Sequence, residues 1–484
     1  MMSNTDTTGG GGILGAMPTR RIQGRSVFRS QGVVRAVRGD LVVATLPMVS
    51  VGTVAVIDRC SASPARCVVV GMDRDNVFLS PLDDLMGVIV GATVCTDQAR
   101  LNLSLEMQEP YRMIDALGAD LFPPSERMKV RSVVFCEPRW RSPRTCLGSI
   151  ALSESSSSVT RVLHDRVGGR RRFVTGIRSL DGLHPIAEGQ RLAIIAAPGC
   201  GKSTLLLQLA AQGDYDVLVM ALVGERRREI REFESRMRQS AQGWRQTIVI
   251  AEPSDASPMR RMLACQAAVA HAEWFARQGK RVVLMVDSLT RVARAIREVS
   301  LARGEKIVRG GYTASVYTEL PRFLERAGPC GQGVITAFYS LLSHDERDVD
   351  PLKEEVISLL DGHVVLSESL ARRGIYPAIH PTQSLSRVAG EIESGAQRRL
   401  RMAFLSGWER LERDRDTVLL GGRPDPELKR LFHAEPTMAA YLTQLHGERV
   451  SLIEGEAMLR GVLEVMNGAP LEAESRPCRG SANR

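Results

Sequence analysis

The sequence predicts an α/β protein in three parts: a small β-barrel, a core with a parallel sheet around a phosphate-binding loop, and a C-terminal helical domain. Three observations support this prediction. Short β-rich runs separated by turn residues fill the region before residue 100. Strongly apolar runs alternate with helical segments in the middle of the chain, and one of them leads into the loop APGCGKST. Helix-prone residues dominate the last part.

The first part divides into a tail, a barrel and a connection. Residues 1–25 are polar, contain the run Gly9–Gly12 and predict a mobile tail. Residues 26–100 contain runs such as GVVRAVRGDLVVATL and RCVVVGMDRDNVFLSPL, whose spacing predicts a small antiparallel barrel. Residues 101–160 are irregular and include the linker-like SESSSS, so we expect a connecting segment with an insertion.

Residues 161–392 predict the core. Six apolar runs are separated by helical patterns: QRLAIIA, DVLVMALV, QTIVIAE, RVVLMVDS, GVITAFYS and HVVLSES. Near-continuous apolar runs of this kind indicate parallel strands that are covered on both faces. From residue 393 to residue 484, stretches such as AQRRLRMAFLSGWERLERDRD predict the helical domain.

Composition narrows the class of protein. The net charge of +9 favours acidic partners such as nucleic acid, an anionic membrane or nucleotide phosphates, although solvated surface arginines explain it equally well. Nine cysteines without CxxC pairs argue against a zinc site or a disulfide framework and suggest a cytosolic protein. The sequence has neither an apolar run of membrane-spanning length nor a secretory signal.

The loop at 197–204 predicts a phosphate site. Gly199 and Gly201 allow the backbone to curl so that successive N–H groups face an anion. Lys202 is expected to reach the β- and γ-phosphates, and Ser203 to place its hydroxyl on Mg²⁺. Ala196 stands where the pattern usually begins with glycine, and we expect its small methyl group to be tolerated.

Two carboxylates follow other strands of the predicted sheet. RVVLMVDS ends near Asp287, where an acid can hold the hydration shell of Mg²⁺. Glu225 follows a glycine at the end of another strand and can orient and polarise an attacking water. The alternative for Glu225 is a glutamate that merely stabilises the start of a helix.

Together these stretches resemble the hexameric ATPases related to the rotary ATP synthase subunits. The resemblance extends over TGIRSLDGL, GERRRE, MVDSLTRVARAIREVS, LPRFLERAG, GVITAFYS, LLDGHVVLS and GIYPAIHPTQSLSRV. The loop with Ala196 and the barrel segments are similar to those of the type III secretion and flagellar export branch. Within this family the resemblance implies a RecA-like core.

The resemblance also implies roles for individual residues. The catalytic set comprises Glu225, Lys202, Arg226 and Arg387, the last as a finger that reaches into the neighbouring subunit's site. The nucleotide-binding set comprises Pro198, Gly199, Cys200, Gly201, Lys202, Ser203, Thr204 and Tyr376, whose ring would stack on adenine. Ser203 and Asp287 would bind Mg²⁺. Without the resemblance, the sequence alone favours a core tyrosine for Tyr376 and a surface ion pair for Arg387.

Four features depart from the family pattern. PYRMIDALGADLF at 110–122 is a degraded turn motif, and residues 128–158 have no counterpart. GGYTASVY at 310–317 lacks the usual prolines, and Arg227 replaces a small residue. These departures affect fine geometry and the choice of partner, and none removes a catalytic group.

The function implied is ATP hydrolysis by a homohexamer that powers type III protein export, releasing chaperones and unfolding substrates. We favour the injectisome, with flagellar export as the alternative. Expected partners are stalk and regulator proteins and chaperone–substrate complexes, with docking on the C-terminal domain. The expected location is the cytoplasm, peripheral at the inner membrane. Residues 303–316 could be a loop facing the ring's pore or an ordinary surface loop.

Three other functions remain as alternatives. Glu225 argues against a non-catalytic ring subunit, which should lack that carboxylate. A ring helicase should display aromatic stacking residues, but residues 26–100 contain only Phe28 and Phe78, so we expect no nucleic-acid partner. A rotary ATP synthase subunit works beside a distinct partner, whereas this chain carries both Glu225 and Arg387.

Overall fold

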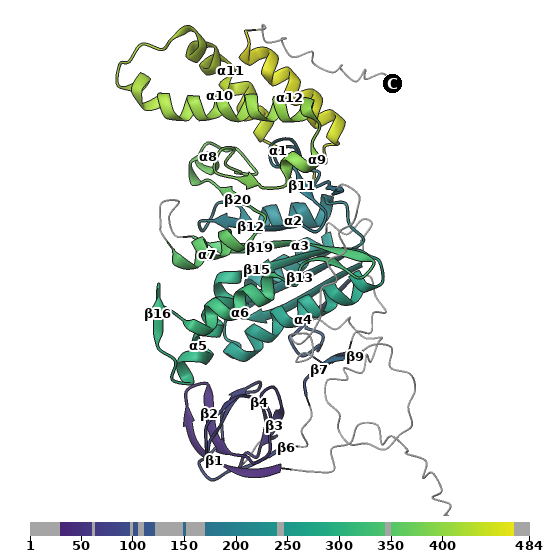
Figure 1. Cartoon of the computed structure of the whole chain (residues 1–484), viewed down its shortest axis with the longest axis vertical. Helices are drawn as coiled ribbons and strands as arrows, with labels where there is room; N and C mark the ends of the chain where they lie inside the picture. Colours follow the sequence, from purple (N-terminus) through teal and green to yellow (C-terminus); the bar gives the residue numbers. More distant parts are fainter. Residues whose placement is uncertain are drawn as a thin grey trace, which may run out of the picture.

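The computed structural model describes residues 30–60, 63–96, 100–104, 111–121, 149–151, 170–239, 246–343 and 350–468. Three layers follow one another along the longest axis of the molecule: the barrel, the sheet with its helices, and the C-terminal helices (Figure 1). This arrangement confirms the predicted fold class. The predicted tail at 1–25 lies outside the described residues, as does the predicted insertion at 128–158 apart from Ser149–Ala151.

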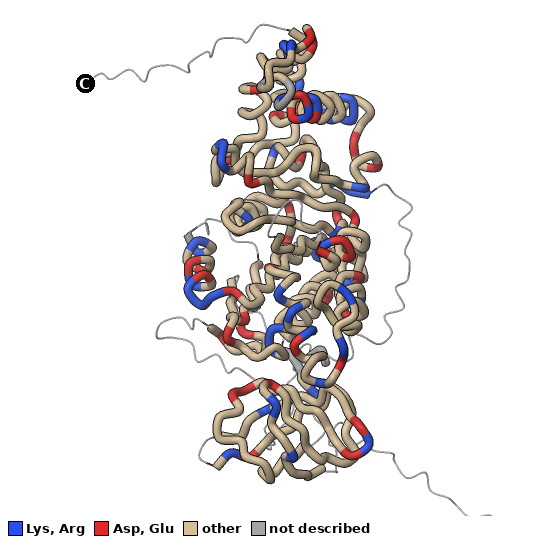
Figure 2. Tube along the Cα trace, turned by 90° about the vertical axis from the view of Figure 1, so that its left-hand side faces the viewer, with Lys and Arg blue, Asp and Glu red and all other residues tan. Residues whose placement is uncertain are grey.

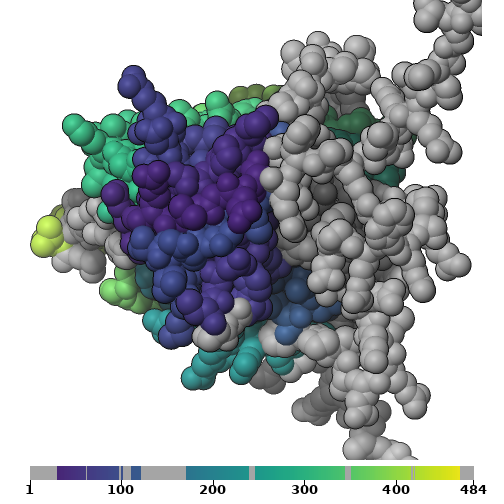
Figure 3. All heavy atoms as spheres, turned by 90° about the horizontal axis from the view of Figure 1, so that it is seen from below, coloured from purple at the N-terminus to yellow at the C-terminus, as the bar shows by residue number. Residues whose placement is uncertain are grey.

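The N-terminal barrel is closed by six antiparallel strands in the order β1-β2-β5-β4-β3-β6. The strands are β1 (Ser30–Arg38), β2 (Leu41–Thr45), β3 (Val54–Ile57), β4 (Ala65–Met72), β5 (Val77–Pro81) and β6 (Thr93–Thr96). Alternate residues such as Val42, Ala44 and Leu79 point inward and fill its core. Figure 3 views the molecule from the barrel end, where these strands lie in front of the core.

The segment after the barrel contributes strands that the sequence analysis did not anticipate. β7 (Asn102–Ser104) pairs with β9 (Ser149–Ala151), although the two are far apart in the chain. β8 (Tyr111–Ile114) runs parallel to β14 and forms one edge of the central sheet. The expectation that residues 111–114 are irregular is wrong. A four-residue strand whose partner lies over 100 residues away in the chain leaves little local signal in the sequence.

The central sheet contains all six predicted strands, and they run parallel to one another. They are β12 (Arg191–Ala196), β13 (Val217–Glu225), β14 (Gln246–Pro253), β15 (Arg281–Asp287), β19 (Gly333–Leu342) and β20 (Gly362–Leu366). The strand order is β21-β20-β12-β19-β15-β13-β14-β8. β21 (Leu385–Ser386) pairs antiparallel with β20, and β18 (Gly328–Cys330) with β19.

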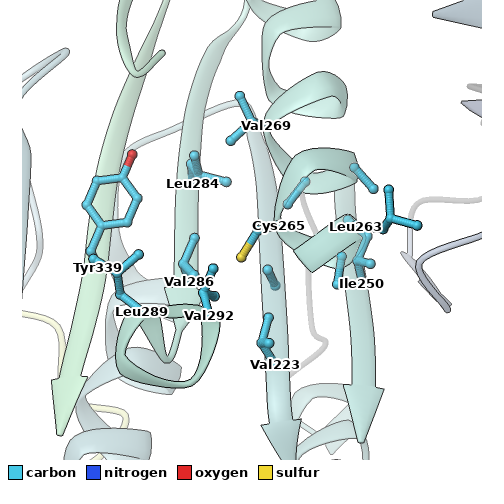
Figure 4. Packing of buried hydrophobic residues seen from close by; sticks show 14 of the residues in the cluster. Val223, Ile250, Leu263, Cys265, Val269, Leu284, Val286, Leu289, Val292 and Tyr339 are labelled. Carbon is cyan, nitrogen blue, oxygen red and sulfur yellow. The ribbon is translucent and has the colours of Figure 1, made fainter. Parts of the chain in front are cut away.

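Helices cover both faces of this sheet (Figure 1). One face packs against α2 (Lys202–Gln212) and α3 (Arg227–Gln239), and the other against α4 (Pro258–Arg277), α5 (Leu289–Ala302), α6 (Ala314–Leu324) and α7 (Pro351–Leu359). Neighbouring residues of a strand therefore enter different cores. In Figure 4, Leu263 and Cys265 of α4 lie against Val223, Ile250 and Val286 of three strands. Such two-sided burial keeps the strand ends in fixed positions.

The C-terminal helices form a third core. α10 (Gly395–Leu419), α11 (Pro426–Leu442) and α12 (Leu452–Met466) enclose Phe404, Trp408 and Tyr441. Asp425 and Ser451 cap α11 and α12 by accepting hydrogen bonds from backbone N–H groups of the first turn. This core also contains four residues that precede α10 in the chain: Leu183, Leu370, Ile375 and Ala378.

The remaining short elements are β10 (Arg172–Phe173), α1 (Arg178–Leu183), β11 (Ile186–Ala187), β16 (Ile307–Arg309), β17 (Tyr312–Thr313), α8 (Glu368–Arg372) and α9 (Ala389–Ile392). β16 and β17 form a hairpin within the segment 303–316.

Surface charge is mixed. In Figure 2, basic and acidic residues are interspersed along the C-terminal helices. Several of these arginines are paired, for example Arg410 with Asp425 and Arg415 with Glu435. Among the described residues, no helix is both long and apolar enough to cross a membrane.

Candidate active site

The phosphate loop joins the end of β12 to the start of α2, as the sequence predicts. Gly199 and Gly201 have φ values of 88° and 87°, a left-handed conformation that side chains disfavour. α2 begins at Lys202, and Ser203 and Thr204 in its first turn are exposed. Pro198 and Gly199 are also exposed, whereas Cys200 is buried. Exposed backbone amides at the start of a helix favour an anion at this position.

Ala196 does not disturb this loop. The residue is fully buried in the sheet, where its register partners are Leu342 on β19 and Leu366 on β20. Its methyl group belongs to the apolar core under α2. The methyl group is thus accommodated inside the core, as expected from the sequence.

Lys202 and Asp287 lie in direct contact. The Lys202 ammonium group binds Oδ1 of Asp287, and the two side chains are only 12% and 5% exposed. Ser340 on β19 donates its hydroxyl to the same Asp287 oxygen at 2.6 Å. β19 lies between β12 and β15, so the strand order itself brings the loop and the acid together.

Glu225 lies at the end of β13, one strand beyond Asp287. Its Oε2 is 2.9 Å from Nη1 of Arg291, and Arg291 also donates to the Gly224 carbonyl. Burial, a hydrogen bond to Glu229 and the charge of Asp287 raise the pKa of Glu225 to about 7. The hydrogen bond from Glu225 in turn lowers the pKa of Glu229. Glu225 is therefore a largely buried carboxyl group with a raised pKa.

Gly224 allows this arrangement. Its φ of 69° is left-handed, and the pairing of β13 with β14 is irregular at this position. A Cβ atom on residue 224 would lie 3.0 Å from Cδ of Arg291. The GER sequence therefore provides both the turn of the chain at Glu225 and the space for Arg291.

Tyr376 lies beside the phosphate loop. Its ring atoms are 3.6 Å from the position of a Cβ on Gly201. The residue is 43% exposed, so one side of the ring is open. A flat aromatic surface next to the phosphate loop can stack on a base.

Of two further predicted residues, Arg226 lies exposed at the margin of this cluster and Arg387 lies apart from it. The side chain of Arg226 is 83% exposed, with its Nε 3.9 Å from Glu229. Arg387 directly follows β21, where its backbone N–H donates to the Asp361 carbonyl and Nη2 is 3.4 Å from the Ile357 carbonyl.

The register of β20 and β21 shows how far Arg387 lies from the phosphate loop. Ser386 pairs with Gly362 at the start of β20, whereas Leu366 at the end of β20 pairs with Ala196 beside the phosphate loop. Arg387 therefore lies near the amino-terminal ends of the parallel strands, roughly 16 Å along the strand direction from the phosphate loop. This distance is more than an arginine side chain spans.

Three residues of the cluster were not singled out from the sequence. Arg291 comes four residues after Asp287, one turn into α5, so its spacing could have indicated it. Ser340 is a buried polar residue near the end of an apolar strand, which is a weak signal. Glu229 lies one helical turn after Glu225, on the same side of the α3 start.

The oxygen donors present suit Mg²⁺. Within the described part of the chain, no group of three or more His, Cys, Asp or Glu side chains could hold a metal ion by itself. Mg²⁺ usually takes one or two protein oxygens together with phosphates and water. The hydroxyl of Ser203 and the carboxylate of Asp287 provide ligands of that kind.

Comparisons with known proteins show the family to which the chain belongs. The nucleotide-binding domain of the ATP synthase alpha/beta family matches residues 176–386. The type 3 secretion system ATPase of Pseudomonas syringae pv. tomato is 35% identical over 463 residues, covering 93% of this chain and 97% of that protein. The flagellum-specific ATP synthase of Treponema pallidum is 36% identical over 426 residues, covering 87% and 90%.

A solved structure matches nearly the whole chain. The assembled ATPase EscN from enteropathogenic E. coli, in complex with its central stalk EscO, superposes with a TM-score of 0.75 at 29% identity, covering 90% of this chain and 100% of the chain in that structure. The phosphate loop, the parallel sheet and the acids at neighbouring strand ends define a P-loop nucleoside triphosphatase. The chain belongs to the family of type 3 secretion system ATPases and flagellum-specific ATP synthases, and it is an ATPase.

Proposed function

We propose that this ATPase hydrolyses MgATP as a homohexameric ring and thereby powers type III protein export, through an injectisome. The observation that carries the proposal is the position of Arg387. It lies at the opposite end of the parallel strands from the phosphate loop of its own chain. An arginine finger at this position can serve a second copy of the chain. Each chain alone would then hold an incomplete site.

Within one chain, the described side chains account for most of the chemistry. Lys202 exchanges the Asp287 carboxylate for phosphate oxygens when the nucleotide enters. Ser203 and Asp287 would hold Mg²⁺, which supplies charge neutralisation at the phosphates. Glu225, in its deprotonated form, orients the attacking water and accepts its proton, while Arg291 fixes the carboxylate.

A neighbouring subunit would complete the site. The charge that develops on the transferring phosphoryl group needs a further cation, and the planar guanidinium group of Arg387 suits that role. EscN, which is similar over almost its full length, is described as an assembled ATPase, and this supports an oligomer. Arg226, exposed at the start of α3, is also available to an adjoining copy.

Partners follow from the same likeness. EscN binds a central stalk, EscO, and we propose a stalk protein for this ring as well. The β16–β17 hairpin presents Ile307 and Val308, which are 53% and 61% exposed, and is our candidate for the pore-facing contact. Regulators and chaperone–substrate complexes would bind outside the core, the latter on α10–α12. The ring would lie in the cytoplasm, peripheral at the inner membrane.

Flagellar export is the second candidate, because flagellum-specific relatives match the chain about as well as secretion ATPases do. Deletion of the gene in its host separates the two. Loss of effector secretion with normal motility supports the injectisome, and loss of motility supports the flagellum.

The ring mechanism is tested by measuring ATP turnover per chain across a dilution series, with the mass of the species recorded at each point. Turnover should rise as subunits associate. The variant Arg387→Ala should associate and still turn over slowly, whereas the control Arg372→Ala, an exposed arginine of α8 paired with Glu368, should behave as wild type. A dilute monomer with full turnover contradicts the proposal.

A further inference from the structure

The segment that carries Tyr376 packs against the C-terminal helices. Ile375 and Ala378, on either side of it, are 4% and 1% exposed and pack into the C-terminal core with Phe404 and Tyr441. The Tyr376 ring itself lies outside this core, beside Gly201. The residues that flank Tyr376 are therefore packed against the C-terminal helices, while its ring lies next to the phosphate loop.

Gln444 links these two regions directly. It lies in the turn between α11 and α12, and its backbone N–H donates to the Tyr376 carbonyl at 2.7 Å. The residue is only 3% exposed. Its side-chain Oε1 accepts from the backbone N–H of Arg178 at 2.9 Å, and Nε2 donates to the carbonyls of Gly176 at 2.8 Å and Glu448 at 2.7 Å. Both donor hydrogens of the amide are thus used.

The same turn also holds the far end of α2. Gln212, the last residue of that helix, donates its Nε2 to the Glu448 carbonyl at 2.6 Å. The backbone N–H of Val450 donates to the Gly176 carbonyl at 3.2 Å. The turn at 443–450 therefore contacts the last residue of the phosphate-loop helix, the segment before the loop, and the tyrosine beside its first residues.

We propose that Gln444 is a positioning residue for the nucleotide base. Its side chain anchors the 443–450 turn to residues 176–178, which precede the phosphate loop in the chain, and so holds Tyr376 against that loop. This inference rests on the proposed stacking of Tyr376 on the base. Without the Gln444 amide, the buried N–H of Arg178 loses its acceptor, the carbonyls of Gly176 and Glu448 each lose one of two donors, and the turn is held less firmly. The Tyr376 carbonyl then loses its fixed donor.

The full-length variant Gln444→Ala tests the proposal. Base stacking contributes equally to the ground state and the transition state, so KM for ATP should rise roughly fivefold to tenfold while kcat changes less than about twofold. As competitive inhibitors, ADP and tripolyphosphate separate base from phosphate binding. The Ki of ADP should rise with KM, whereas the Ki of tripolyphosphate, which has no base, should stay unchanged.

Gln397→Ala is the matched control. Gln397 also lies in the C-terminal domain and also donates a side-chain hydrogen bond, to Glu456 at 2.9 Å. This variant should leave KM and both inhibition constants unchanged. Thermal denaturation should show that both variants are folded. Gln444→Met, which keeps the volume of the side chain, replaces Gln444→Ala if the latter unfolds, and unfolding of both would overturn a role confined to positioning.

A double-mutant comparison separates this inference from the proposed function. In a Tyr376→Ala background, Gln444→Ala should add nothing to the Ki of ADP, because it acts through Tyr376. If Tyr376→Ala alone leaves the Ki of ADP unchanged, the assignment of Tyr376 to the base is wrong. If Tyr376→Ala weakens ADP but Gln444→Ala adds its full factor, or weakens tripolyphosphate as much as ADP, the positioning role is overturned.

Discussion

At the scale of single residues, Glu225 is the group on which hydrolysis should depend most. It is fixed by Arg291 at 2.9 Å and lies one strand from Asp287. Glu225→Gln keeps the shape and the contact to Arg291 but cannot accept a proton, so turnover should fall about a hundredfold or more. Binding of a fluorescent ATP analogue should stay within a factor of about two, because the binding groups are intact. Unchanged turnover would show that another group activates the water.

The raised pKa of Glu225 predicts how turnover depends on pH. The carboxyl group is protonated below its pKa of about 7 and cannot act as a base there, so turnover at saturating ATP should rise as pH increases through this value. Burial is the largest cause of the raised pKa of Glu225. The hydrogen bond to Glu229 and the negative charge of Asp287 raise this pKa further.

Glu229→Gln tests that explanation. The substitution removes a negative neighbour, lowers the pKa of Glu225 and should move the acid limb of the pH–rate profile to lower pH. Glu232→Gln on the same helix, where the carboxylate pairs with exposed Arg228, should leave the profile in place. A limb that does not move with Glu229→Gln would argue against the shared proton.

Single residues also show what a sequence can predict about a site. Lys202, Ser203 and Asp287 follow from local patterns, because a loop between a strand and a helix and an acid at a strand end are both visible along the chain. Ser340 could not be predicted in this way. It joins the site only because β19 inserts between β12 and β15 in the sheet.

At the scale of elements, the junction of β13 and α3 depends on Gly224, which adopts a left-handed backbone conformation and leaves space for Arg291. Gly224→Ala introduces a side chain at a φ of 69° and 3.0 Å from Cδ of Arg291, at a backbone cost of about 1–2 kcal/mol. The melting temperature should drop by a few degrees, and turnover should fall at least about tenfold because Arg291 and Glu225 are displaced.

Gly390→Ala in α9 is the control for this change, because a Cβ at residue 390 meets no atom within 4 Å. Its melting temperature and turnover should match those of the wild type. Equal losses in both variants would mean that Gly224 has no special role at the active site.

Elements differ in how visible they are in the sequence. The six parallel strands are apolar on both faces, so their short continuous apolar runs and the helical patterns between them identify them. β8 and the pair β7–β9 are short and depend on partners far along the chain, so no local pattern indicates them. The C-terminal helices were predicted from composition, but their packing against Ile375 and Ala378 was not, because contacts between distant segments leave no periodic signal.

At the scale of the whole molecule, Arg387 lies apart from the other residues to which we assign catalytic roles. The phosphate loop, Asp287 and Glu225 lie at the carboxyl ends of the parallel strands. β21 runs antiparallel and carries Arg387 toward their amino-terminal ends. The sequence alone offered Arg387 only through a family resemblance. The strand register supplies a physical argument for the proposed role: Arg387 lies too far from the phosphate loop of its own chain, so we propose that it serves an adjoining copy.

Mixing two inactive variants tests this central claim most directly. Lys202→Ala lacks the phosphate-binding ammonium group but keeps Arg387, and Arg387→Ala has the reverse defect. Each alone should be nearly inactive, and co-assembled rings should regain turnover at interfaces where Lys202 of one copy meets Arg387 of the next. Mixed assemblies, shown by mass to contain both variants, that remain as inactive as either variant alone would contradict the account.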